Sequence, residues 1–181
     1  MTRKTSAYAR RKARPCASYA DSLGGLRLIS ELRPFDQAEV STLTLAPQMA
    51  YQAISTGKAQ PGDFDTLAAV VNVTLVRAER IELVGYGQPD DTPEELADQQ
   101  AIGREMVALA KEAQDALMHM RQRFLRTGRW GVDAAARETL PAVLDLHHQI
   151  LQLSLPKQMK AALLEVLDRC KKGQVHRTQD A

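Results

Sequence analysis

The chain has 181 residues, of which 44% are hydrophobic and 25% charged, the proportions of a single soluble globular domain. No apolar stretch approaches the roughly 18 residues that a membrane helix needs, and two isolated cysteines form neither a disulfide framework nor a metal-binding spacing. The composition therefore argues against a membrane-spanning protein and a disulfide-stabilised secreted domain, and we expect a cytoplasmic protein.

A basic segment opens the chain. Residues 1–35 carry eight basic and two acidic groups, whereas the remainder carries 16 basic and 20 acidic groups, although the net charge is only +2. The segment is polar and contains Pro15, so we expect a flexible, partly disordered arm over residues 1–35. An arginine- and serine-rich start with no acid before Asp21 is also typical of a mitochondrial transit peptide, but a solvated arm is the simpler interpretation.

The first helix is predicted to begin at Asp36, because Glu39 three positions later completes a capping box. Apolar residues then recur at helical spacing, and Gly57 is a typical C-terminal stop. Pro47 lies within this pattern, so we expect a kink or a break into two short helices.

A second helix is predicted from about Pro61. Several β-branched side chains occur over residues 70–76, so a strand is the alternative, but the length of the segment and its flanking caps favour a helix. Its packed face, with apolar positions at spacings of four and three, is expected at Leu67, Val71, Thr74, Ala78 and Ile81.

The clearest start signal is Thr92-Pro93-Glu94-Glu95, which combines an N-cap, a proline at the first helical position and a glutamate at the third. The third helix is predicted over residues 93–127. At about 1.5 Å per residue it would be roughly 50 Å long, which suits the spine of the fold or a homodimer interface. Its packed face is expected at Ile102, Met106, Leu109, Ala113, Ala116, Met120 and Phe124.

This register of the third helix makes two further predictions. Glu112 and Gln122 should face solvent. Gly128 should end the helix, whereas Gly103 lies within it and should tolerate replacement by alanine.

A fourth helix is predicted after Asp133, with Pro141 in its interior, and a fifth from Pro156 to about Gly173. The chain then divides into the arm (1–35), a helical bundle domain (36–173) and a frayed tail (174–181). The inward residues of the last two helices are expected to be Leu140, Leu144, His147, Leu151, Met159, Leu163, Val166 and Cys170.

A weak internal repeat relates two parts of the chain. Thr56-Gly57-Lys58 parallels Thr127-Gly128-Arg129, and the helices that follow share further positions at an offset of 73. Two antiparallel hairpins packed pseudo-symmetrically would explain the repeat; the alternative is that any two helical hairpins share a glycine stop and an apolar restart. We therefore expect an all-α bundle of about five helices built from two antiparallel hairpins.

Two stretches also suggest a family resemblance. Arg126-Thr-Gly-Arg-Trp-Gly-Val-Asp133 and Phe64-Asp-Thr-Leu-Ala-Ala-Val-Val-Asn72 resemble short helical proteins of unknown function encoded on phages, prophages and plasmids of proteobacteria. The similarity covers roughly residues 36–153 together with a basic, proline-bearing N-terminus, and residues 90–120 are outside it. The resemblance implies a bacterial mobile-element origin and brings no catalytic residue.

The basic arm is the strongest functional signal. Six positive groups within 14 residues could neutralise several phosphates and give salt-dependent binding without sequence readout. The alternative is a tail that only keeps the protein soluble. The nucleic-acid-binding residues that we predict are Arg3, Lys4, Arg10, Arg11, Lys12 and Arg14.

A second basic cluster closes the third helix. It consists of Arg121, Arg123, Arg126 and Arg129, and it could extend the anion-binding surface of the arm. A simpler interpretation is that these arginines oppose the dipole at the end of the helix, while the interleaved Phe124 and Trp130 belong to the core.

The sequence carries no catalytic or metal-binding signature. Nucleophile elbows, phosphate-binding glycine loops and His/Glu metal spacings are all missing, so we predict no catalytic residue, no metal and no cofactor. His147 falls on an apolar face and is more simply a core histidine than a ligand.

These observations predict a non-enzymatic accessory or regulatory protein of a mobile element, which engages nucleic acid or a nucleoprotein complex through the arm. The alternative is an inhibitor or adaptor that binds a host or defence protein through its helical surface. A homodimer through residues 93–127 is compatible with either function, and we expect no membrane association.

Overall fold

The computed structural model describes residues 33–86 and 90–173, and all its regular elements there are helices. The helices in chain order are α2 (Gln37–Ser55), α3 (Pro61–Val84), α4 (Pro93–Thr127), α5 (Ala134–Leu153) and α6 (Pro156–Lys171). The predicted all-α bundle of five helices is thus confirmed, and the valine-rich stretch over 70–76 is helical. Most of the arm and the tail predicted at 174–181 lie outside the described residues.

Side-chain caps set the helix starts where the sequence predicts them. Asp36 accepts a hydrogen bond from the Glu39 backbone N–H at 2.9 Å, and the Glu39 carboxylate accepts from the Asp36 N–H at 2.8 Å. Thr92 and Glu95 form the same reciprocal pair at the start of α4. The Asp133 carboxylate caps α5 through the Ala136 N–H.

Glycines end two helices in the predicted way. Gly57 and Gly128 have φ values of 71° and 69°, a left-handed conformation that costs glycine little. The Lys58 N–H bonds back to the Ala53 carbonyl at 2.8 Å, and the Gly128 N–H to the Phe124 carbonyl at 2.7 Å, so carbonyls at both helix ends are satisfied.

Of the kink or break predicted at Pro47, the break is wrong, because α2 runs without interruption from Gln37 to Ser55. Pro47 lacks an N–H and removes one helical hydrogen bond, but its ring is buried among the core residues of α2. Burial of the proline ring offsets the loss of this hydrogen bond, so the helix continues past Pro47. Pro141 is likewise accommodated inside α5.

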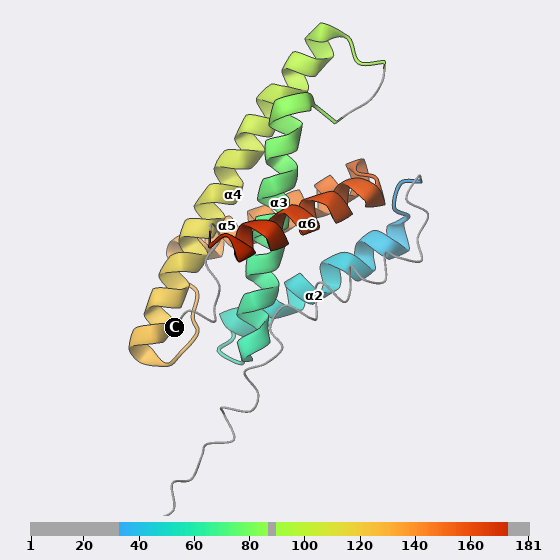
Figure 1. Cartoon of the computed structure of the whole chain (residues 1–181). Coiled ribbons are helices and arrows are strands. Elements are labelled where there is room, and N and C mark those ends of the chain that lie inside the picture. Colours follow the sequence, from blue (N-terminus) through green and yellow to red (C-terminus); the bar gives the residue numbers. More distant parts are fainter. Residues whose placement is uncertain (1–32, 87–89, 174–181) are drawn as a thin grey trace, which may run out of the picture.

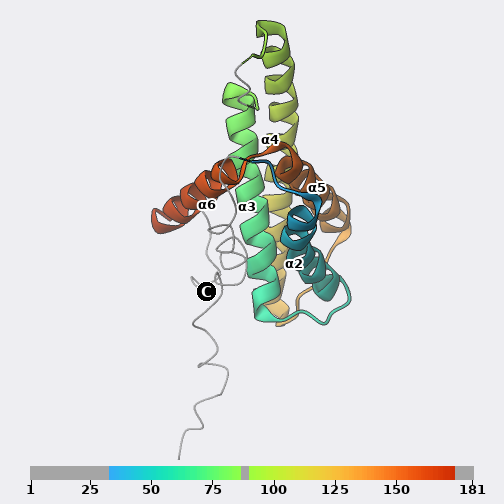
Figure 2. The same cartoon turned by 90° about the vertical axis from the view of Figure 1, so that its right-hand side faces the viewer.

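Helix α3 is the centre of the bundle and packs against α2, α4, α5 and α6. The most extensive contact is with α4, which runs antiparallel to α3, and one end of this pair extends beyond the other helices (Figures 1 and 2). The pairs α2–α3 and α4–α5, which the two hairpins require, also pack together. The predicted inward face of α3 is buried at each of its five positions, Leu67, Val71, Thr74, Ala78 and Ile81.

The buried face of α4 is rotated from the predicted one. Met106, Ala113, Ala116 and Met120 are buried as expected, but Ile102 is 44% exposed. Other positions of α4 are buried in its place, among them Gly103, which lies directly against the backbone of α3. The additional buried residues are Gly103, Val107, Ala110 and Leu117.

Gly103 explains this close approach and corrects the prediction that alanine would be tolerated there. A Cβ at Gly103 would lie 2.6 Å from Cα of Glu82 on α3, a distance that real contacts do not reach. Only glycine therefore fits where α4 crosses the α3 backbone.

Candidate functional site

The aromatic residues near the end of α4 hold the loop between α4 and α5. The indole of Trp130 stacks on Phe124 with a centroid distance of 4.1 Å and on Phe64 of α3 at 4.5 Å. Trp130 also packs against the buried core. These rings therefore have the structural role expected of them, and they fix the loop that carries Arg129.

One of the four arginines in the second basic cluster has a defined internal role. Arg123 pairs with Asp133 at 2.9 Å, and both side chains are only partly exposed. Because Asp133 also caps α5, this ion pair connects the last turns of α4 to the first turn of α5. Arg123 therefore has its carboxylate partner within the fold.

The other three arginines of the cluster form no ion pair with any described residue. Arg126 and Arg129 are exposed, and Arg121 is half-buried. No acidic residue occurs between Asp115 and Asp133 in the sequence, so nothing nearby along the chain compensates their charge. Their three positive charges outweigh the partial negative charge at the C-terminal end of α4. This end of the helix is therefore net positive and can hold phosphate groups.

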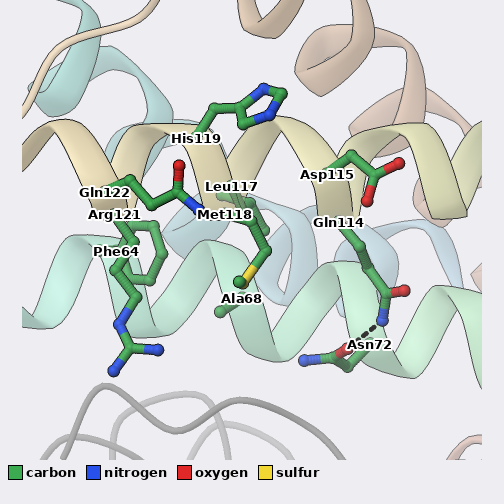
Figure 3. A pocket seen from close by; sticks show the side chains of 10 residues that line it. All are labelled: Phe64, Ala68, Asn72, Gln114, Asp115, Leu117, Met118, His119, Arg121 and Gln122. Atoms are coloured by element: carbon green, nitrogen blue, oxygen red, sulfur yellow. Dashed lines mark hydrogen bonds between the residues drawn. The ribbon is translucent and has the colours of Figure 1, made fainter. Parts of the chain in front are cut away.

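A groove of about 510 Å³ runs between α3 and α4 beside this basic end, and Figure 3 shows its lining. Arg121 lies at one end of the groove, and the amide of Gln114 donates a 2.6 Å hydrogen bond to Asn72 further along it. The lining residues are Phe64, Ala68, Asn72, Gln114, Asp115, Leu117, Met118, His119, Arg121 and Gln122. The walls combine polar amides with one acidic and one arginine side chain, so the groove itself has no strong charge.

The sequence identified Arg121 but not Asn72 or Gln114 as part of a surface feature. Neutral amides carry no charge pattern, and their proximity depends on the α3–α4 packing that only the fold reveals. The structure thus brings together the basic end of α4 and the groove. The six arm residues, Arg3, Lys4, Arg10, Arg11, Lys12 and Arg14, lie outside the described residues.

His147 is a core residue, as predicted. Its ring is fully buried, and Nδ1 lies 2.9 Å from Oγ1 of Thr74 on α3. Burial lowers the pKa of His147 to about 4, and the charge of His148 acts in the same direction. A neutral imidazole at physiological pH is the consequence.

The described residues contain no group of three or more His, Cys, Asp or Glu side chains arranged to hold a metal ion. Within the same residues, no helix has the length and apolarity to cross a membrane. The features that remain are the basic end of α4, which can bind an anionic surface, and the groove beside it.

Comparison with protein-family models, curated proteins and solved structures finds no match for the chain. The resemblance to proteins of mobile elements therefore rests on the sequence stretches alone. The class that the structure defines is an all-α helical bundle with a basic end.

Proposed function

We propose that the protein binds nucleic acid, or a nucleoprotein complex, through the N-terminal arm and the basic end of α4, as a non-enzymatic accessory or regulatory protein of a bacterial mobile element. The observation that carries the proposal is the set of three arginines, Arg121, Arg126 and Arg129, which have no carboxylate partner among the described residues. The arm supplies six further positive groups.

The mode of binding follows from this chemistry. Arginine side chains neutralise phosphates and release the counterions bound to them. The affinity for nucleic acid should therefore fall steeply as the salt concentration rises. Trp130 and Phe124 are stacked on one another and unavailable for stacking on bases. We therefore propose recognition of the phosphate backbone without readout of the base sequence.

The test for the α4 part of this surface is a double substitution, Arg126→Gln with Arg129→Gln. Binding to a DNA duplex should weaken, and the slope of log affinity against log salt should become shallower by about 0.9 for each phosphate that the variant no longer neutralises. Lys111→Gln with Arg104→Gln is the matched control, because both residues are exposed on α4 and the charge change is the same. Equal weakening by the two double variants would mean that only net charge matters.

A second candidate function is protein binding through the extended end of the α3–α4 pair. Leu83, Val84 and Ile102 are 63%, 52% and 44% exposed there. The Gln100 amide donates to the Leu83 carbonyl at 2.9 Å, so these apolar side chains come from adjacent turns of the two helices. An exposed apolar patch of this kind suits a protein partner, either a second copy of the chain or a host or defence protein.

A nuclease treatment separates the two functions. If the protein captures a stoichiometric partner from a bacterial extract after nuclease digestion, and Leu83→Glu with Ile102→Glu abolishes the capture, the protein-binding function is supported. Loss of all partners on digestion supports nucleic-acid binding. Sedimentation of the purified chain with and without the same two substitutions tests the homodimer.

A further inference from the structure

Arg77 on α3 carries a buried positive charge that has no counter-charge among the described residues. Arg77 is only 4% exposed to solvent. The Nε atom donates a hydrogen bond to Oγ of Ser154 at 3.1 Å, but Nη2 is buried and has no hydrogen-bond partner. Across residues 33–86 and 90–173, Nη2 is the only buried side-chain nitrogen or oxygen in this situation.

No described carboxylate compensates this charge. The two glutamates nearest this region, Glu79 of α3 and Glu165 of α6, both pair with Arg169, and Glu165 also lies 3.8 Å from Arg80. Burial lowers the pKa of Arg77, the neighbouring Tyr86 opposes this effect, and the positive charge of Arg80 adds to it. A buried charge without its partner is strongly destabilising, so a bound anion at this position would stabilise the fold.

The groups around Arg77 are hydrogen-bond donors. Ser154 is 2% exposed and lies at the junction where α5 ends and α6 begins. Tyr86 follows the end of α3, and burial raises the pKa of its hydroxyl, which therefore keeps its proton. Gln158 of α6 donates to the Tyr86 carbonyl at 3.4 Å, which holds this segment against the start of α6.

The helix ends at this junction have opposite effects. The last carbonyls of α5 carry a partial negative charge, which stabilises the Arg77 guanidinium in part. The start of α6, at Pro156, carries the partial positive charge of a helix N-terminus, which favours an anion nearby, while the N–H groups of Leu155, Gln158 and Met159 already have acceptors within the fold. Beside the unpartnered Nη2 of Arg77, the Ser154 hydroxyl and the Tyr86 phenol each carry a proton that a bound anion can accept.

We propose that Arg77, Ser154 and Tyr86 form a binding site for a small oxyanion, either a phosphate or a carboxylate, at the junction of α3, α5 and α6. Guanidinium N–H groups match the paired oxygens of both anions. Because Nη2 has almost no accessible surface, neighbouring side chains must move to admit a ligand, and a small free ion requires less movement than the backbone of a polymer. It is also distinct from the basic end of α4, since Arg77 lies 13 residues, about 20 Å, along α3 from Phe64.

The test is the melting temperature of the full chain at constant ionic strength, with sodium chloride partly replaced by sodium phosphate or by sodium acetate. At about ten times the dissociation constant, the bound anion should raise the melting temperature by about 3 °C relative to chloride. A rise in phosphate alone identifies a phosphate site, and a rise in acetate alone a carboxylate site.

Arg77→Met removes the charge at similar length, and the resulting protein should melt at the same temperature in all three salts. Arg80→Met is the matched control, because Arg80 is the exposed arginine three residues later, and this variant should keep the full rise. Phosphate stabilises many proteins non-specifically, so an equal rise in all variants overturns the proposal, as does no rise in the unaltered chain.

Should Arg77→Met fail to fold, Ser154→Ala gives the second test, since it removes only the hydroxyl that positions the guanidinium. This variant should lose at least half of the anion-dependent rise, and an undiminished rise would contradict the site. Arg77→Met should leave nucleic-acid binding unchanged, which separates this inference from the proposed function.

Discussion

Oγ1 of Thr74 lies 2.9 Å from Nδ1 of His147, and the two residues are 73 positions apart, the offset that relates the two copies of the internal repeat. Equivalent positions of the copies thus meet each other where α3 crosses α5. The buried positions on the two helices coincide at the same offset, with Leu67 matching Leu140 and Val70 matching Val143. This is the contact expected of two related hairpins arranged about a local two-fold axis.

The burial of His147 predicts a loss of stability in acid. Its pKa is about 4 in the fold, against the ordinary histidine value of 6.5, so the unfolded chain binds the proton more readily. The contribution of neutral His147 to the free energy of unfolding is therefore fully present above pH 6.5 and is lost as the pH decreases toward 4. At pH 5 the loss is about 2 kcal/mol. Urea denaturation of the unaltered chain and of His147→Gln at pH 7.5 and pH 5 measures this.

Glutamine at position 147 can still bond to Thr74 but does not titrate. The stability advantage of the unaltered chain over His147→Gln should therefore shrink from pH 7.5 to pH 5. A constant difference would show that the His147 pKa is not lowered by the fold.

Gly103→Ala should destabilise the protein by about 1–3 kcal/mol or more, because the added methyl group overlaps the Glu82 backbone. Gly62→Ala is the matched control: Gly62 also lies within a helix, but no atom lies within 4 Å of its Cβ position. That substitution should be neutral or stabilising by about 0.5–1 kcal/mol. Thermal melts compare the two, and equal effects would contradict the close α3–α4 crossing.

Gly57→Ala and Gly128→Ala should each destabilise by about 1–2 kcal/mol for a different reason. Their Cβ positions are open, so the cost comes only from the left-handed backbone. Asparagine tolerates this conformation better than alanine, so Gly128→Asn should recover part of the loss in a thermal melt. No difference between alanine and asparagine would point to a cost other than backbone strain.

Ala113→Lys should destabilise by several kcal/mol, on the order of 3, because Ala113 is completely buried between α4 and its neighbours. Glu112→Lys, one residue earlier, places the same side chain on the exposed face and should be nearly neutral. Chemical denaturation of both variants checks the register of α4, and comparable losses would mean that the register is wrong.

The helix boundaries could be predicted from the sequence because they depend on local chemistry. The Asp36 and Thr92 caps and the Gly128 stop each act within four residues of the helix end, so their patterns are visible in the chain. The role of Gly103 could not be predicted, because it depends on how closely α4 approaches the backbone of α3.

The same distinction applies to the candidate sites. The arginines at the end of α4 can be recognised in the sequence by their charge. The ion pair between Arg123 and Asp133 could not be predicted, because it forms only where the loop after α4 folds back. Arg77 gave no signal, since it lies in a valine-rich helix and its partner Ser154 is 77 residues away in the sequence.

Nucleic-acid binding by the arm is the central claim, and the most direct measurement is the salt dependence of DNA binding by fluorescence anisotropy. The full chain is compared with a variant in which Arg3, Lys4, Arg10, Arg11, Lys12 and Arg14 are all replaced by glutamine. We predict that the affinity of the variant falls at least tenfold, with a shallower salt dependence and an almost unchanged melting temperature. Binding as tight as that of the full chain, at every salt concentration, would contradict the account.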